Sequence, residues 1–124
     1  MMLLFSSVTQ AFALPPGLLA SICFVESGYR ASVIHKDDGG QDSLGLCQVQ
    51  YTTAKAVGFK GKPKQLLNPA TNAYYAGKFL ASQIKRYHDV DRGIVAYNLG
   101  HYSPTYTKYL KKVRKAWKTH PHDN

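Results

Sequence analysis

The segment from Asn68 to Tyr87 restricts the fold more than any other part of the sequence. Asn68 precedes a proline, a pairing typical of a helix start, because asparagine caps the helix and proline suits its first turn. Apolar or small residues then recur at helical spacing, which predicts an amphipathic helix that ends before His88. They are Ala73, Ala76, Gly77, Leu80, Ile84 and Tyr87. Glycine inside a helix costs about 1 kcal/mol relative to alanine, so another helix is expected to approach Gly77 closely.

Similar start and stop signals predict four further helices in this chain of 124 residues, which is the length of one domain. They run from about Pro16 to Tyr29, from Thr52 or Thr53 through Val57, from a cap at Asp91 to Leu99, and from Ser103-Pro104 to about Lys118. Residues 31–44 form a long polar loop, and residues 45–50 are either a buried strand or a tight helical turn. The predicted fold is mainly α: about five helices, few or no strands, and a long polar loop after the first helix.

The two ends of the chain are predicted to lie outside the main domain of residues 14–118. Residues 1–13 are largely apolar and end in Ala-Phe-Ala, which fits a secretory signal. They lack a positively charged start and contain polar residues, so an amphipathic helix is the alternative. Residues 119–124 are predicted to be disordered, and no stretch is long enough to cross a membrane.

The charge of the chain is strongly positive, with 16 Lys and Arg against 7 Asp and Glu. This balance predicts attraction to a polyanion. Nucleic acid, anionic lipid and anionic cell-wall polymers are all polyanions of this kind. No nucleic-acid-binding motif is present. Much of the charge lies on one side of the last predicted helix, at Lys108, Lys111, Lys112, Arg114, Lys115 and Lys118. The apolar face of this helix holds Tyr106, Tyr109, Leu110, Val113 and Trp117.

Two cysteines, Cys23 and Cys47, match no metal-ligand spacing and are compatible with one disulfide or with two buried thiols. We expect no metal and no cofactor.

Glu26, the only glutamate, lies in the apolar segment from Ala20 to Gly28. Apolar surroundings raise the pKa of a carboxyl group, which suits a general acid at neutral pH. The alternative is that Glu26 caps the helix or pairs with a basic residue; the segment alone leaves both open.

Three short motifs occur in one order along the chain: Glu26-Ser27, Gly45-Leu46-Cys47-Gln48 and Ala96-Tyr97-Asn98-Leu99-Gly100. Asn68-Pro69, Asn72 and Gly77 lie between them. Together they closely resemble the lytic transglycosylases of the soluble type (SLT), a lysozyme-like family that cleaves peptidoglycan. The resemblance covers residues 14–100. It departs from the family pattern at Asp42 and Ser43, where glycine and alanine are usual, and at Cys47, which replaces a methionine.

The resemblance implies a role for each matching residue. Glu26 is the catalytic acid and base, Ser27 orients substrate, and Gln48 lines the sugar subsites. Tyr97 donates a hydrogen bond to Glu26, and Asn98 lies near the substrate. Desolvation of Glu26 is expected to outweigh the bond from Tyr97, so its pKa should rise. If residues 45–49 pack on the first helix, Cys23 and Cys47 are expected to form a disulfide.

The resemblance also implies a reaction, a lytic cleavage of peptidoglycan glycan strands between N-acetylmuramic acid and N-acetylglucosamine that leaves 1,6-anhydromuramoyl ends. The expected enzyme is a monomer in the periplasm or outside the cell, phage-encoded or associated with secretion, with anionic cell-wall polymers as a second partner of the basic last helix. One alternative is a goose-type-like muramidase in which Asp37, Asp38 or Asp42 activates water. Another is an inactive cell-wall-binding module.

Overall fold

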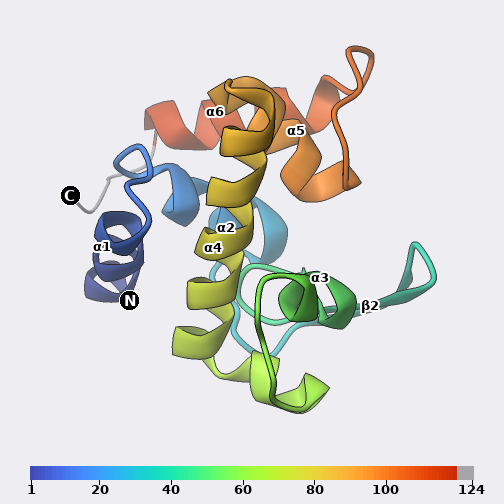
Figure 1. Cartoon of the computed structure of the whole chain (residues 1–124). Coiled ribbons are helices and arrows are strands. Elements are labelled where there is room, and N and C mark those ends of the chain that lie inside the picture. The colour runs from blue at the N-terminus through green and yellow to red at the C-terminus, as the bar shows by residue number, and fades with distance from the viewer. Residues whose placement is uncertain (120–124) are drawn as a thin grey trace.

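The computed structural model describes residues 1–119 and contains ten elements, with the long helix α4 near the centre (Figure 1). In chain order they are α1 (Met2–Ala11), α2 (Leu18–Ser27), β1 (Ile34–Asp38), β2 (Gln41–Leu44), β3 (Val49–Gln50), α3 (Tyr51–Ala56), the 3-10 helix η1 (Pro63–Leu67), α4 (Pro69–Tyr87), α5 (Val90–Leu99) and α6 (Lys108–Thr119). The mainly α prediction is confirmed. Its five helices correspond to α2–α6, and α1 is a sixth. No helix among residues 1–119 combines the length and the apolar character needed to cross a bilayer.

The predicted start of α4 is confirmed, because the Asn68 side chain accepts a hydrogen bond from the Thr71 amide and Pro69 occupies the first turn. The helix ends at Tyr87, and the next residue, His88, has a left-handed φ of 53°. Its buried side faces several elements at once, since α4 contacts α1, α2, α3, α5 and η1. A helix surrounded in this way explains the apolar periodicity of the sequence.

Three of the predicted helix starts are wrong. Gln50 precedes α3 with no side-chain cap, so neither Thr52 nor Thr53 is the cap. Asp89 rather than Asp91 caps α5, by accepting from the Arg92 amide at 2.8 Å. The last helix begins at Lys108 instead of Ser103-Pro104, because residues 103–107 close on themselves in turns.

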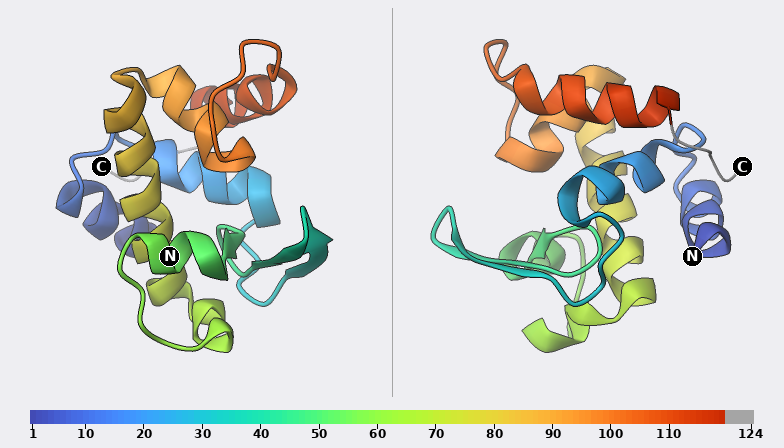
Figure 2. Two further views of the ribbon diagram at one scale, coloured as in Figure 1. Left: turned by 45° about the vertical axis from the view of Figure 1, so that its right-hand side comes forward. Right: turned by 180° about the vertical axis from the view of Figure 1, so that it is seen from behind.

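The region expected to be a long polar loop contains a β-hairpin that projects from the body (Figure 2). Asp38 pairs with Gln41 across Gly39 and Gly40, which both have positive φ. A two-residue turn with positive φ at both positions matches the twist of a hairpin. Strand β3 then adds to β2, so the few strands of the described chain form one three-stranded sheet, and the interpretation of residues 31–44 as a loop is corrected. All five residues of β1 are exposed, which explains the lack of an apolar alternation.

Residues 1–13, for which the sequence left a secretory signal or an amphipathic helix open, form α1 and the turn that follows it. Phe5 and Val8 are buried in the common core, and α1 contacts α2 and α4. This packing supports the amphipathic-helix interpretation. Of the segment predicted to be disordered, Thr119 is the last residue of α6, and residues 120–124 lie outside the described part of the chain.

Gly77→Ala is expected to lower the free energy of unfolding by roughly 1–3 kcal/mol, the usual range for overpacking, although alanine favours helices. A Cβ at Gly77 would overlap Val8 Cγ1 on α1 and approach Leu19 Cδ2 to 3.3 Å. Urea unfolding measures the change. Adding Val8→Ala should recover part of the loss, and a Gly77→Ala protein as stable as the wild type would contradict the packing of α1 on α4.

Candidate active site

A cleft of about 370 Å³ lies between the β-sheet and the α4–α5 side of the molecule. Glu26, Gln48, Tyr97 and Asn98, which the sequence singled out, all line it, and so does Tyr106. Ser27 does not. The fold therefore brings together four of the five residues that the three motifs nominate, from α2, the turn before β3, and α5.

Glu26 is half-buried in the last turn of α2. Helix α2 ends at Gly28, which adopts a left-handed φ of 64° and lets the chain turn away from the carboxylate. Tyr109 Oη donates to Glu26 Oε2 at 2.7 Å, and Asn98 Nδ2 donates to the same oxygen at 3.3 Å. Both donors bind Oε2. The other oxygen, Oε1, contacts neither donor, so a proton on Oε1 does not face them.

Burial raises the pKa of Glu26 above the ordinary glutamate value, against the opposing hydrogen bonds from Tyr109 and Asn98. The charge of Asp38 adds to the increase and that of His35 reduces it. The expected upward shift is confirmed in direction. Burial, and next the Glu26 charge, also place the pKa of the Tyr109 hydroxyl well above its usual range. Tyr109 therefore keeps its hydroxyl proton near neutral pH and donates it to the hydrogen bond with Glu26.

The predicted hydrogen bond from Tyr97 to Glu26 is wrong. Tyr97 Oη donates instead to the Cys47 carbonyl at 2.7 Å, and Tyr109 takes the place assigned to Tyr97. Tyr109 appeared in the sequence only as an apolar position of the last helix. A tyrosine at such a position looks the same whether its hydroxyl reaches solvent or a catalytic group, so the sequence carried no signal for its role.

Ser27 is buried and holds the main chain rather than facing the cleft. Its hydroxyl donates to the Leu46 carbonyl at 2.6 Å and accepts from the Arg30 amide at 3.0 Å. The assignment of Ser27 to substrate orientation is therefore corrected: its bonds join the end of α2 to the turn before β3.

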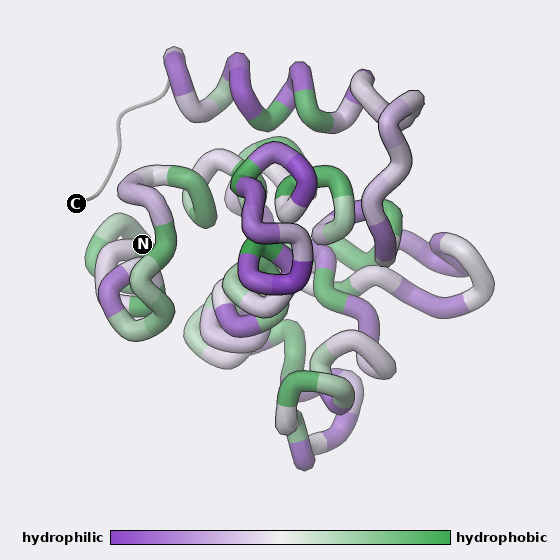
Figure 3. Tube along the Cα trace, turned by 45° about the horizontal axis from the view of Figure 1, so that its top comes forward, coloured by the Kyte–Doolittle hydropathy of each residue, from purple (hydrophilic) through white to green (hydrophobic). Residues whose placement is uncertain are grey.

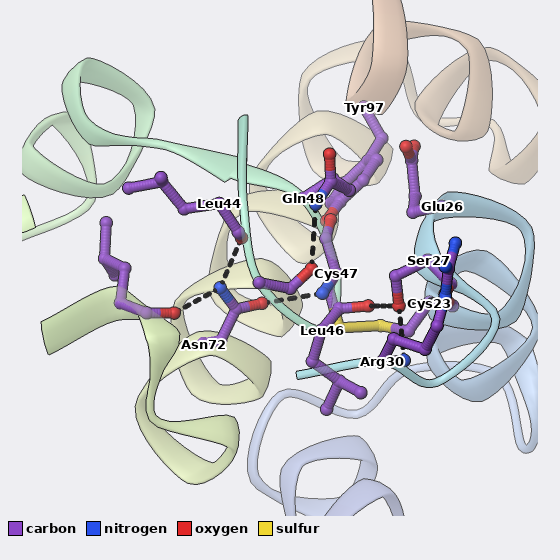
Figure 4. Close-up of a disulfide and its surroundings, with 12 residues drawn as sticks. Cys23, Glu26, Ser27, Arg30, Leu44, Leu46, Cys47, Gln48, Asn72 and Tyr97 are labelled. Carbon is purple, nitrogen blue, oxygen red and sulfur yellow. Dashed lines mark hydrogen bonds between the residues drawn. A yellow bond between two sulfur atoms is a disulfide. The ribbon is translucent and has the colours of Figure 1, made fainter. Parts of the chain in front are cut away.

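The turn formed by residues 45–48 is fixed from several sides (Figure 4). A disulfide joins Cys47 to Cys23, which lies one helical turn before Glu26. The Asn72 side chain, fully buried on α4, accepts from the Cys47 amide at 2.8 Å and donates to the Leu44 and Leu66 carbonyls. The sequence used Asn72 only as a spacing marker and missed this function.

Gln48 is the last residue of this turn and has a left-handed φ of 55°. Its Nε2 donates to the carbonyls of Val33 and Gly45 at 3.1 and 3.0 Å. Its Oε1 lies 2.6 Å from His35 Nδ1, so that nitrogen carries the hydrogen and donates it. The side-chain amide is thus held by protein groups, and Gln48 forms a rigid part of the cleft lining.

The three aspartates considered for a hydrolase lie on the hairpin, and only Asp38 lines the cleft. Its Oδ2 accepts from Ser43 Oγ at 2.7 Å. Asp42 accepts from the Asp37 amide and pairs with Lys36, and these interactions lower its pKa. Asp37 and Asp42 therefore stabilise the hairpin. Residues 1–119 contain no cluster of three or more His, Cys, Asp or Glu side chains that is able to hold a metal ion.

Comparison with known proteins gives a family and a fold. The model of the transglycosylase SLT domain matches residues 4–120. Protein IpgF of Shigella flexneri is 26% identical over 93 residues, which cover 73% of this chain and 61% of IpgF. The solved complex of the 70-kDa soluble lytic transglycosylase with bulgecin A has the same fold, with a TM-score of 0.70 and 21% identity over 92% of this chain and 19% of that one. The chain thus spans less than two thirds of either relative, and the family match extends over nearly all of it. It belongs to the transglycosylase SLT domain family.

Proposed function

We propose that this chain is a peptidoglycan lytic transglycosylase in which Glu26 is the catalytic residue, acting in the periplasm or outside the cell. The observation that carries the proposal is a half-buried glutamate in the cleft of an SLT domain, with a raised pKa and both hydrogen-bond donors on one oxygen. A carboxyl group that serves first as acid and then as base requires a pKa near the working pH.

The reaction proceeds in two proton transfers at Glu26. The protonated carboxyl gives its proton to the glycosidic oxygen between N-acetylmuramic acid and N-acetylglucosamine, and the bond from that oxygen to C1 breaks. The N-acetyl group of the substrate supports the positive charge that develops at C1. The Glu26 carboxylate then takes the proton of the C6 hydroxyl, whose oxygen closes on C1. The product is a 1,6-anhydromuramoyl end, and no water is consumed.

The surroundings of Asp38 favour this lytic route over hydrolysis. Most glycosidases use a second carboxylate as base or nucleophile. Asp38 is the one other carboxylate that lines the cleft among the described residues, and its Oδ2 already accepts a hydrogen bond from Ser43. The substrate N-acetyl group fills the role that a second carboxylate has in a hydrolase.

Mass spectrometry of the products from purified peptidoglycan tests the proposal. The expected fragments are lighter by one water than those of a muramidase. Reducing ends of full mass would establish a hydrolase. Intact sacculi that bind the protein and release no fragments would establish a cell-wall-binding module instead.

We also propose that the outer face of α6 contacts anionic polymers of the cell wall. Its polar positions face away from the body (Figure 3). Arg114 pairs with Asp91, whereas the exposed side chains of Lys111, Lys115 and Lys118 have no acidic partner among the described residues. These three lysines are spaced by about one helical turn and form a stripe along α6.

Reversal of this stripe, with Lys111, Lys115 and Lys118 all changed to Glu, is expected to weaken binding to polymer-bearing sacculi roughly tenfold, at about 0.5 kcal/mol for each exposed contact. Sedimentation with sacculi that carry or lack the anionic polymer measures the effect at low and high salt. The matched control changes Lys60, Lys62 and Lys64, which are exposed near η1, to Glu. Equal losses for both triple variants would mean that only net charge matters.

A further inference from the structure

Tyr106 lies in the loop between α5 and α6 and lines the cleft. Its hydroxyl donates a hydrogen bond to Asn98 Oδ1, and Asn98 Nδ2 donates to Glu26 Oε2 at 3.3 Å. A chain of two hydrogen bonds therefore links Tyr106 to the glutamate through a single amide group. No motif singled out Tyr106, which the sequence placed on the apolar face of the last helix.

An asparagine amide has one accepting end and one donating end, and the two are interchanged when the group flips. The Glu26 carboxylate is an acceptor, so Nδ2 faces it, and the Tyr106 hydroxyl donates to Oδ1 and holds the amide in this orientation. In the flipped orientation Oδ1 would face the carboxylate, and two acceptors would repel each other. We propose that Tyr106 is a positioning residue that fixes the Asn98 amide so that Asn98 donates to Glu26.

The loop that carries Tyr106 is built to hold it in this place. The Tyr106 amide donates to the Ser103 carbonyl at 3.2 Å, and the Tyr102 amide donates to Tyr87 Oη at 2.9 Å. The late start of α6 at Lys108 leaves Tyr106 outside the helix. Had the helix begun at Ser103-Pro104, Tyr106 would have been fixed in its first turn rather than in a separate loop.

The consequence for catalysis rests on the proposed function. A hydrogen bond from Asn98 favours the ionised form of Glu26, which is the form that takes the C6 proton. The other groups that act on this carboxylate are Tyr109 on α6, Tyr97 on α5, and Asp38 and His35 on β1. None of these contacts Asn98 in the described hydrogen bonds, so the hydrogen-bonded link from Tyr106 to Glu26 runs through the Asn98 amide. Tyr106 also interacts electrostatically with Tyr109.

Because Glu26 is the only glutamate, protein labelled with 13C at the glutamate carboxyl gives one side-chain resonance. Its titration reports the pKa of Glu26 without substrate. Tyr106→Phe is expected to raise this pKa, and Asn98→Ala should shift it in the same direction. The double variant should titrate like Asn98→Ala, because Tyr106 has no effect once the amide is gone. Tyr102→Phe, on the same loop, should leave the pKa unchanged.

An unchanged Glu26 pKa in Tyr106→Phe would overturn the inference, and so would shifts that add in the double variant. The titration is independent of the proposed function, whose own failure would appear as wild-type protein that releases no anhydro products. In an active enzyme, a higher Glu26 pKa should also move the alkaline limb of the pH–rate profile to higher pH.

Discussion

Glu26→Gln is expected to abolish cleavage of peptidoglycan and to leave the fold intact. The amide cannot protonate the glycosidic oxygen and cannot take the C6 proton, so both proton transfers are lost. General acid–base catalysis contributes roughly 10²–10⁴-fold to a rate. The loss should be at least that large, because one group performs both steps. Release of soluble fragments from sacculi measures it, and the glutamine oxygen still accepts from Tyr109 and Asn98 if it occupies the position of Oε2.

The same substitution should not lower stability at neutral pH. The pKa of Glu26 is higher in the folded protein than in the unfolded chain, so the folded state binds the proton more tightly. The ionised carboxylate therefore disfavours folding, and this effect grows as the pH rises from the ordinary pKa toward the raised one. Glu26→Gln removes it. Urea unfolding measures the free energy of unfolding of both proteins at pH 4 and pH 7. The difference, variant minus wild type, should be more positive at pH 7 than at pH 4.

Asp38→Asn is the matched control, because it neutralises the other cleft carboxylate and keeps an oxygen for the bond from Ser43. A lytic transglycosylase should retain most of its activity after this change. A loss comparable to that of Glu26→Gln would identify Asp38 as a second catalytic carboxylate. It would restore the hydrolase mechanism as the better account.

The sequence predicted the parts of the site that depend on local pattern. A carboxyl group at an apolar helix end made Glu26 a candidate, to which the three ordered motifs added a role, and an asparagine followed by proline identified the start of α4. The hairpin was missed because β1 is exposed and both of its strands are mostly polar, although Gly39-Gly40 is a pair typical of a two-residue turn.

The parts that were missed depend on which of several side chains, far apart in the sequence, forms a given hydrogen bond. Tyr97 and Tyr109 are both mostly buried tyrosines near Glu26, and the resemblance assigned the bond to the wrong one. Tyr97 donates to the Cys47 carbonyl, 50 residues away in the sequence. Tyr109, which is 83 residues from Glu26, donates to the carboxylate instead. No local pattern distinguishes these two outcomes, because both hydroxyls lie on apolar helix faces.

Replacing Cys23 and Cys47 together by alanine is expected to lower the free energy of unfolding by roughly 3 kcal/mol, the chain-entropy value for a loop of this size. The two residues are 24 positions apart and fully buried, so alanine leaves no exposed polar group behind. Urea unfolding measures the change. A reductant should destabilise the wild type by a similar amount and have no effect on the double variant, which separates the loss of the disulfide from other effects of the substitutions.

The activity of this variant should fall less than its stability suggests. The turn at residues 45–48 keeps three other attachments when the disulfide is removed: Ser27 to the Leu46 carbonyl, Tyr97 to the Cys47 carbonyl and Asn72 to the Cys47 amide. Folded protein should therefore retain cleavage at low temperature. Asn72→Ala, which leaves the Leu44 and Leu66 carbonyls and the Cys47 amide without their partner, should reduce activity more at equal folded fraction. The opposite order would show that the covalent link, rather than the hydrogen bonds, holds the wall of the cleft in place.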